Sequence, residues 1–238
     1  YTGRYTYSTG NGTMSTADFG TGRTATFAYD KLQRLTSETM AGLYTKSYTY
    51  RDISSTRTTT QIASESYTGL CSGWSDRGAS YTYDAMGNIA TITGPCKNKK
   101  SVQRTYTYDA QNQLLSEKIG SDTTSYTYDT AGNIRSVTGP GVTKTFTYND
   151  TGDWKDLLTS VTVNGTTRNI TYEEENGVTI GNPLSYFNGT QYTLAWQNGR
   201  QLASLSGGGK SATYTYGADG IRTSKTVTDS SGTTTYQY

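Results

Sequence analysis

Histidine is absent from this 238-residue sequence, and long apolar segments are absent with it. Without histidine the chain lacks the side chain of most acid–base catalysis, of Ser-His-Asp and Cys-His nucleophiles, and of many metal sites. No apolar run approaches the roughly 18 to 20 residues that a membrane-spanning helix needs. These absences predict a chain that is not an enzyme, takes no cofactor, holds no metal and has no membrane span.

Large aliphatic side chains are also scarce, because leucine, isoleucine, valine and phenylalanine supply only 32 residues. Such a low share would indicate disorder if the net charge were high. The formal net charge is only +2, however, and the chain has 22 tyrosines. Tyrosine, threonine, glycine, serine and asparagine favour strands joined by tight turns over helix. We therefore expect an all-β chain that is ordered by tyrosine and threonine packing.

The near-neutral charge gives no field that would attract nucleic acid over a long range. One basic cluster stands out, and we expect it in a loop without a ligand: Lys97, Lys99, Lys100 and Arg104. The sequence therefore predicts no nucleic-acid partner.

One pattern recurs along the chain with a period near 22 residues. Its clearest copies are YTYDAMGNIATITG from Tyr81, YTYDAQNQLLSEKIG from Tyr106 and YTYDTAGNIRSVTG from Tyr126. The second aromatic position of each copy falls at Tyr7, Tyr29, Tyr50, Tyr83, Tyr108, Tyr128, Tyr148, Tyr172, Leu194, Tyr216 and Tyr238. A fixed period of this length indicates a repeat protein rather than a single globular core.

Each copy is interpreted as one β-hairpin. Tyr81 and Tyr83 alternate with a threonine, so both rings point to one face of a strand. Asp84 then caps a type I turn, Gly87 supplies the left-handed residue of a G1 bulge, and Asn88 begins the return strand. The later copies repeat these positions at Tyr106, Tyr108 and Asp109, and at Tyr126, Tyr128, Asp129, Gly132 and Asn133.

The predicted architecture is an array of about ten antiparallel β-hairpins. Residues 1–238 form a single array with an insertion at 68–80, where the spacing widens to 33 residues, and Gly94-Pro95 and Gly139-Pro140 mark turns between hairpins. About twenty paired strands do not stay flat, so we expect a long curled or spiralling sheet. The open edges at its two ends are then either covered by this curl or paired end to end with another copy of the chain.

Two cysteines, Cys71 and Cys96, flank the hairpin that begins at Tyr81. Cys71 lies twelve residues before Tyr83 and Cys96 thirteen after it, so folding of the hairpin brings both toward its open end. We predict a disulfide, which would contribute about 3 kcal/mol by loop closure and would indicate an oxidising compartment. The alternative is a pair of reduced thiols.

The tyrosine, aspartate, turn glycine and asparagine of these copies resemble the YD, or RHS, repeat family along essentially the whole chain. This family includes bacterial polymorphic toxins, wall-associated proteins, shell subunits of insecticidal toxin complexes and animal teneurins. The resemblance implies a long sheet that spirals into a hollow shell, often around a C-terminal toxin domain. A core segment rich in DPxGR and YYDP-like motifs, which supports self-cleavage in toxin members, does not occur in this sequence. Autoproteolysis is therefore not carried over.

Ligand-binding alternatives remain for several side chains. The tyrosines form either a structural ladder or platforms that stack on sugars, and Trp74, Trp154 and Trp196 are the candidate sugar-stacking residues because they fall outside the regular pattern. The turn aspartates Asp30, Asp84, Asp109 and Asp129 suggest turn caps more than calcium ligands, since Ca²⁺ needs six to eight clustered oxygens.

The acidic triplet Glu173–Glu175, with Asp153 and Asp156, could supply the paired carboxylates of a glycosidase. A solvated turn explains the triplet better. The glycosylation sequons at Asn11, Asn164 and Asn188 are also the Asn-Gly pairs of hairpin turns.

The leading hypothesis is a non-catalytic structural scaffold of a large exported bacterial RHS protein, secreted or at the cell surface. It would form part of a shell or spiral that encloses a toxin or presents an adhesive tip, so its partner would be the rest of its own polypeptide. The alternative is an extracellular carbohydrate-binding or cell-surface adhesion module, whose partner would be a cell-surface glycan.

Overall fold

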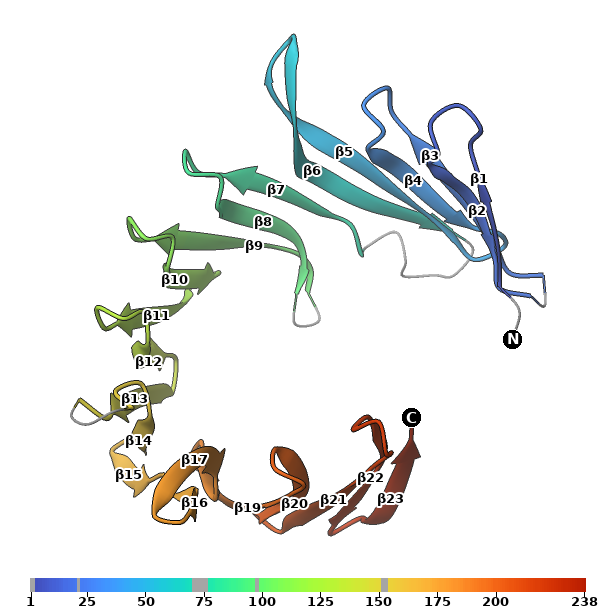
Figure 1. Ribbon diagram of the computed structural model, residues 1–238. Helices are drawn as coiled ribbons and strands as arrows, with labels where there is room; N and C mark the ends of the chain where they lie inside the picture. The colour runs from blue at the N-terminus through green and yellow to red at the C-terminus, as the bar shows by residue number, and fades with distance from the viewer. Residues whose placement is uncertain (1–2, 21, 70–76, 97–98, 151–153) are drawn as a thin grey trace. The chain divides into compact units, whose positions relative to one another are not determined.

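The computed structural model of the chain describes residues 3–20, 22–69, 77–96, 99–150 and 154–238 (Figure 1). These residues form 23 β-strands joined by turns, with no α-helix among them. The prediction of an all-β hairpin array is confirmed. The chain divides into two compact units, residues 1–123 and residues 124–238.

The first unit is a succession of hairpins. Its strands are β1 (Arg4–Tyr7), β2 (Met14–Asp18), β3 (Thr24–Tyr29), β4 (Leu35–Met40), β5 (Tyr44–Ser54), β6 (Arg57–Gly69), β7 (Ala79–Tyr83), β8 (Ile89–Cys96), β9 (Lys99–Tyr108) and β10 (Leu114–Ile119). Strand β11 (Asp122–Tyr128) contains the boundary between the units.

The second unit continues the same pattern. Its strands are β12 (Ile134–Gly139), β13 (Val142–Tyr148), β14 (Leu158–Val163), β15 (Thr166–Asn169), β16 (Tyr172–Glu175), β17 (Val178–Pro183), β18 (Ser185–Phe187), β19 (Gln191–Gln197), β20 (Gln201–Gly207), β21 (Lys210–Tyr216), β22 (Arg222–Asp229) and β23 (Gly232–Gln237).

Pairing follows chain order throughout. Strands β1 to β15 form one antiparallel sheet, β16 and β17 form a two-stranded sheet, and β18 to β23 form a six-stranded sheet. The expected meander is therefore interrupted twice, on either side of the β16–β17 hairpin. Within most hairpins the register shifts by one residue just before the marker aromatic, as between Thr82 and Tyr83.

The wide spacing between Tyr50 and Tyr83 has two sources. Ile62 pairs with Tyr50 and follows it by twelve residues, whereas Ile89 pairs with Tyr83 and follows it by six. The β5–β6 hairpin is thus extended beyond the regular turn position. The rest of the added length lies in the connection between β6 and β7, where the insertion expected at 68–80 stays a prediction because residues 70–76 lie outside the described residues.

Two local predictions are wrong. Gly94 and Pro95 were expected to form a turn, but both lie inside β8, where a Cβ on Gly94 would meet the carbonyl oxygen of Gly78 at 2.9 Å. Gly94 therefore permits close strand packing. Lys99, Lys100 and Arg104 were expected in a loop, but they lie in β9, where Arg104 pairs with Ile92. The turn expected at Gly139-Pro140 lies one residue later, because Gly139 ends β12 and Pro140 and Gly141 form the turn, with Gly141 at φ +73°.

Aliphatic packing is concentrated in the second unit. Val161, Val163, Ile170 and Phe187 are each less than 9% exposed and contact one another. Partly buried neighbours complete this cluster: Val142, Phe146, Leu158 and Tyr172. In the first unit the buried apolar residues are the directly paired Ala17 and Ala25, so hydrogen bonds and aromatic rings carry more of its order.

Candidate functional surfaces of the repeat array

The hairpin turn of each repeat is built on its aspartate. One carboxylate oxygen of Asp84 accepts hydrogen bonds from the backbone N–H groups of Met86 (2.9 Å) and Asn88 (2.8 Å). The Gly87 N–H donates to the Asp84 carbonyl, and Gly87 has φ +91°, which is the geometry of a type I turn with a G1 bulge. Burial alone would raise the pKa of Asp84, but these hydrogen bonds hold it below its usual value. Asp109 and Asp129 make the same pair of bonds in their own turns.

The asparagine after the turn glycine joins neighbouring turns. The Asn88 amide donates to Asp84 of its own turn (3.1 Å) and to the side-chain oxygen of Asn112 in the next turn (2.7 Å). Asn133 repeats this arrangement with Asp129 (3.1 Å) and with Asp156 (3.0 Å). The turn residues therefore align one hairpin with the next, in addition to closing the hairpin itself.

The marker tyrosine of a hairpin donates a hydrogen bond to the preceding hairpin. The Tyr108 hydroxyl donates to the carbonyl oxygen of Ile89 at 2.9 Å, and Tyr83 donates to Ile62 at 2.8 Å. The acceptor is in each case a leucine or isoleucine of the previous return strand. The same inter-hairpin tyrosine bond is made from Tyr50 to Leu35, Tyr148 to Ile134, Tyr172 to Leu158 and Tyr216 to Leu202.

This bond was not expected from the sequence. Its acceptor nevertheless has a sequence correlate, because it always belongs to a leucine or isoleucine, and in Ile89 and Ile134 this residue directly follows the turn Gly-Asn. Burial raises the pKa of the donating phenols Tyr50, Tyr83, Tyr108, Tyr148 and Tyr172. The phenols thus stay protonated donors well into the alkaline range.

The opposite face of the array carries paired hydroxyl groups. The threonine between the two repeat tyrosines hydrogen-bonds to a serine or threonine directly across the hairpin, as between Thr82 and Thr91 at 2.7 Å. Further pairs on this hydroxyl face are Thr6 with Thr16, Thr49 with Ser64, Thr107 with Ser116, Thr127 with Ser136 and Thr215 with Ser224. Each hairpin therefore has a tyrosine face and a hydroxyl face.

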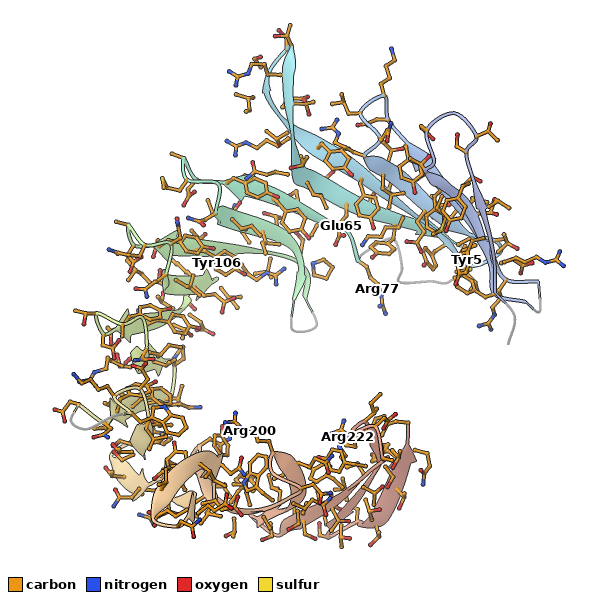
Figure 2. All side chains as sticks on the ribbon, viewed as in Figure 1. Tyr5, Glu65, Arg77, Tyr106, Arg200 and Arg222 are labelled. Carbon is orange, nitrogen blue, oxygen red and sulfur yellow. The ribbon has the colours of Figure 1, made fainter. Side chains whose placement is uncertain are left out.

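Charged side chains interleave with the rings on the tyrosine face of β4 to β6 (Figure 2). Lys46 forms an ion pair with Glu65 at 2.8 Å and lies 4.8 Å from the ring centre of Tyr48. Burial opposes it, but the bond to Glu65 keeps the pKa of Lys46 above its usual value. The Tyr44 hydroxyl donates to Glu38 at 2.6 Å, and this bond raises the pKa of Tyr44 to about 12.

The candidate sugar-stacking tryptophans have distinct positions. Trp196 occupies the marker position of its hairpin, since it pairs with Leu202 just after the register shift, and its indole N–H donates to the carbonyl of Pro183 at 2.7 Å. The assignment of Leu194 as the marker is therefore wrong by two residues. Trp154 is 42% exposed, and its ring lies over Gly181, where a Cβ would come within 2.5 Å of the indole. Trp74 lies outside the described residues.

The predicted disulfide cannot be placed, because Cys71 and the side chain of Cys96 lie outside the described residues. The acidic triplet was expected in a turn, and this is wrong. Glu173, Glu174 and Glu175 lie in β16, and the turn is formed by Asn176 and Gly177, with φ +53° and +77°. Asn176 and Gly177 have the left-handed conformation that a two-residue hairpin turn requires. The turn therefore forms at this pair, and the triplet before it belongs to the strand.

A hollow of about 330 Å³ lies beside this triplet, between β16–β17 and the β19–β20 turn. Glu173 accepts a hydrogen bond from the buried amide of Asn182 at 2.7 Å, and Asn182 also donates to the carbonyl of Gly199. Trp196 and Asn198 complete the wall of the hollow. In the part of the chain that the structure describes, no three histidine, cysteine or acidic side chains cluster in a way that could hold a metal ion.

Residues 77–156 match the family of the teneurin YD-shell, and they contain the three clearest hairpins of the array. Over these residues the chain is similar to the YD-repeat family. Its repeat hairpin can now be described as an aspartate-capped turn, a hydroxyl face, and a tyrosine face with a bond to the preceding hairpin.

Solved structures of toxin-complex proteins share the fold of this chain. The Tc holotoxin pore of Photorhabdus luminescens superposes with a TM-score of 0.62 and 18% identity, over 99% of this chain and 14% of that one. A TcdB2–TccC3 crystal structure gives 0.55 and 17%, over 99% and 13%. The chain therefore spans about one seventh of the length of these proteins. No curated protein sequence matches it, and none of its described segments is a helix long and apolar enough to cross a membrane.

Proposed function

We propose that this chain is a non-catalytic wall segment of a larger exported bacterial protein, in which it forms part of a shell that encloses a toxin or presents an adhesive tip. The observation that carries the proposal is the inter-hairpin tyrosine bond, made by seven marker residues including Trp196. Each of these seven hairpins uses its marker side chain to hold the preceding hairpin. Such an array extends by adding hairpins and has no need of a central core, which suits a wall.

The likeness to toxin-complex structures supports this reading. Essentially the whole chain aligns with about one seventh of the length of two such proteins, so the segment has the fold of part of a much larger protein. The partner in this proposal is the rest of the same polypeptide, and the location is outside the cell or at its surface.

Limited proteolysis of the parent polypeptide tests the enclosure. If the array walls a compartment, the segment that follows it in the parent should be digested much more slowly in the intact protein than as a separately expressed fragment. A matched control carries a protease-accessible tag on an outer turn, which should be cut at the same rate in both. Equal digestion of the following segment in both forms would contradict enclosure.

The second candidate function is an extracellular carbohydrate-binding or adhesion module. The observation that favours it is a set of exposed tyrosines beside cations that form no ion pair among the described residues. These lie at the end of the second unit, where Tyr236 and Tyr238 are 49% and 67% exposed. Titration of the chain with neutral and acidic polysaccharides, followed by tyrosine and tryptophan fluorescence, tests it. Flat titrations with every polysaccharide would remove this candidate.

A further inference from the structure

The last hairpins of the chain are locally basic. Residues 185–238, all of which the structure describes, contain four cations and two acids. The cations are Arg200, Lys210, Arg222 and Lys225. Both acids are used in turns, since Asp219 accepts a hydrogen bond from the Ile221 N–H at 3.0 Å and Asp229 from the Ser231 N–H at 2.8 Å. The positive charge is therefore not neutralised by the acids of the same segment.

Two of these cations stand among tyrosines on the face of β21 to β23. Lys225 pairs directly with Tyr214 on one side and Tyr236 on the other, and its ammonium lies 5.1 Å from the Tyr236 ring centre. The Arg222 guanidinium lies 4.6 Å from the ring of Tyr238 and 5.7 Å from that of Tyr214. These five residues are called the cation–tyrosine strip.

The strip differs from the equivalent surface of the first unit. There two of the ring-contacting cations have their own carboxylates, in the Lys46–Glu65 pair at 2.8 Å and the Arg34–Asp30 pair at 2.6 Å, whereas Arg51 donates to the side chain of Gln61 at 2.9 Å. Arg222 and Lys225 form no ion pair with any carboxylate in the described part of the chain. Arg222 is exposed and extends from the same side of the sheet as Arg200 (Figure 2). The strip thus presents charge and aromatic surface together to solvent.

We propose that the cation–tyrosine strip binds an acidic polysaccharide. Arg222 and Lys225 would pair with its carboxylate or sulfate groups, and the rings of Tyr214 and Tyr236 would contact the apolar faces of its sugars. The two rings stand on strands two apart, about 9.6 Å along the hydrogen-bonding direction, so they can contact successive sugars of one chain. This inference deepens the second candidate function and rests on it, and it is independent of the scaffold proposal.

Charge and chemistry favour this occupant over other polyanions. Nucleic-acid binding draws on many phosphate contacts and a strongly basic surface, whereas the whole chain has a formal net charge of +2. An acidic peptide would use the cations but would leave the exposed rings of Tyr236 and Tyr238 without a matching surface. An acidic polysaccharide uses both at modest charge density.

The test measures binding of the 238-residue chain to polygalacturonate and to chondroitin sulfate at low salt. Dextran serves as the neutral polysaccharide, and poly-glutamate and oligothymidine as polyanions without a sugar chain of this kind. The variants are Arg222→Gln, Lys225→Gln and the double variant, with Lys118→Gln as the matched control. Lys118 is an exposed cation that pairs with Thr105, in register with the hydroxyl face. Unchanged far-ultraviolet circular dichroism shows that each variant is folded.

We expect binding to at least one acidic polysaccharide that weakens as salt is added, because exposed charges are screened. Each strip substitution should weaken binding about two- to fivefold, as expected for one exposed ion pair, and the double variant more. Lys118→Gln should bind as the parent chain does. The inference is overturned by no binding to either acidic polysaccharide, by equal or tighter binding to poly-glutamate or oligothymidine, or by an equal loss in Lys118→Gln. Binding to dextran alone would also overturn it, while leaving the second candidate function in place.

Discussion

Replacing Tyr108 with phenylalanine isolates the contribution of one inter-hairpin tyrosine bond. The substitution keeps the half-buried ring and removes only the hydroxyl that donates to the Ile89 carbonyl at 2.9 Å. A hydrogen bond of this kind contributes a net of about 0.5 to 1.5 kcal/mol, because folding exchanges it for bonds to water. We therefore expect Tyr108→Phe to lower the free energy of unfolding by about 1 kcal/mol, chiefly by loosening the contact of the β7–β8 hairpin with the β9–β10 hairpin.

Urea titration followed by circular dichroism measures this change. With a slope of about 1 to 3 kcal/mol per molar urea, the transition that reports the first unit should move down by about 0.3 to 1 M at an unchanged slope. Tyr7→Phe is the matched control, since Tyr7 holds the marker position of the first hairpin and its hydroxyl has no hydrogen-bond partner among the described residues. Equal midpoints for Tyr108→Phe and the parent chain, or equal shifts in both variants, would refute the reasoning.

Three further predictions concern turns, an ionised pair and a glycine. Asp84→Asn should destabilise the chain at neutral pH; because the folded pKa of Asp84 is lowered, this difference should disappear in acid unfolding curves as the pH falls below about 4. Tyr44 should remain a phenol above pH 10 and ionise near pH 12, because its hydrogen bond to Glu38 raises its folded pKa. In phenolate absorbance titrations, Glu38→Gln should bring this ionisation back toward pH 10. An unchanged titration would contradict the assignment. Gly181→Ala places a methyl group against Trp154 at φ +85°, so it should cost about 1 to 2 kcal/mol in thermal unfolding and shift the tryptophan emission, whereas Gly10→Ala, with open space around it, should do neither.

The hairpin itself could be predicted from the sequence because its determinants are local. Alternation of Tyr81, Thr82 and Tyr83 determines which side chains lie on each face of the strand. Asp84, which directly follows, and Gly87 determine the turn. All of these lie within seven residues of one another, where turn chemistry and strand period are sufficient. The same local signals correctly located turns as far apart as those at Asp30 and Asp129.

Features that depend on the neighbouring hairpin could not be predicted in this way. The acceptor of Tyr108 lies 19 residues earlier, at Ile89, and a backbone carbonyl leaves no mark in the sequence. The register of the hairpin at Trp196 was misread because Leu194 fits an aliphatic core position as well as an aromatic one. The Asn176-Gly177 turn was missed because the repeat pattern, which favours a turn directly after the aromatic position, conflicted there with stronger turn chemistry.

In each repeat, the residues that join neighbouring hairpins are different from the residue at one variable strand position. Neighbouring hairpins are joined by the turn asparagine, which bonds to the next turn, and by the marker tyrosine, which bonds to a backbone carbonyl. Neither bond involves the residue that pairs with the first tyrosine of the repeat. That position holds Glu65 opposite Tyr48, Glu117 opposite Tyr106, Val161 opposite Phe146 and Lys225 opposite Tyr214. The residue at this position therefore differs in charge and size between hairpins that share the same fold, and at Val161 it is part of the buried aliphatic cluster. In the proposed wall, this position would carry Lys225 of the proposed cation–tyrosine strip in one hairpin and Glu65 of an ion pair in another, because it takes no part in the inter-hairpin tyrosine bonds.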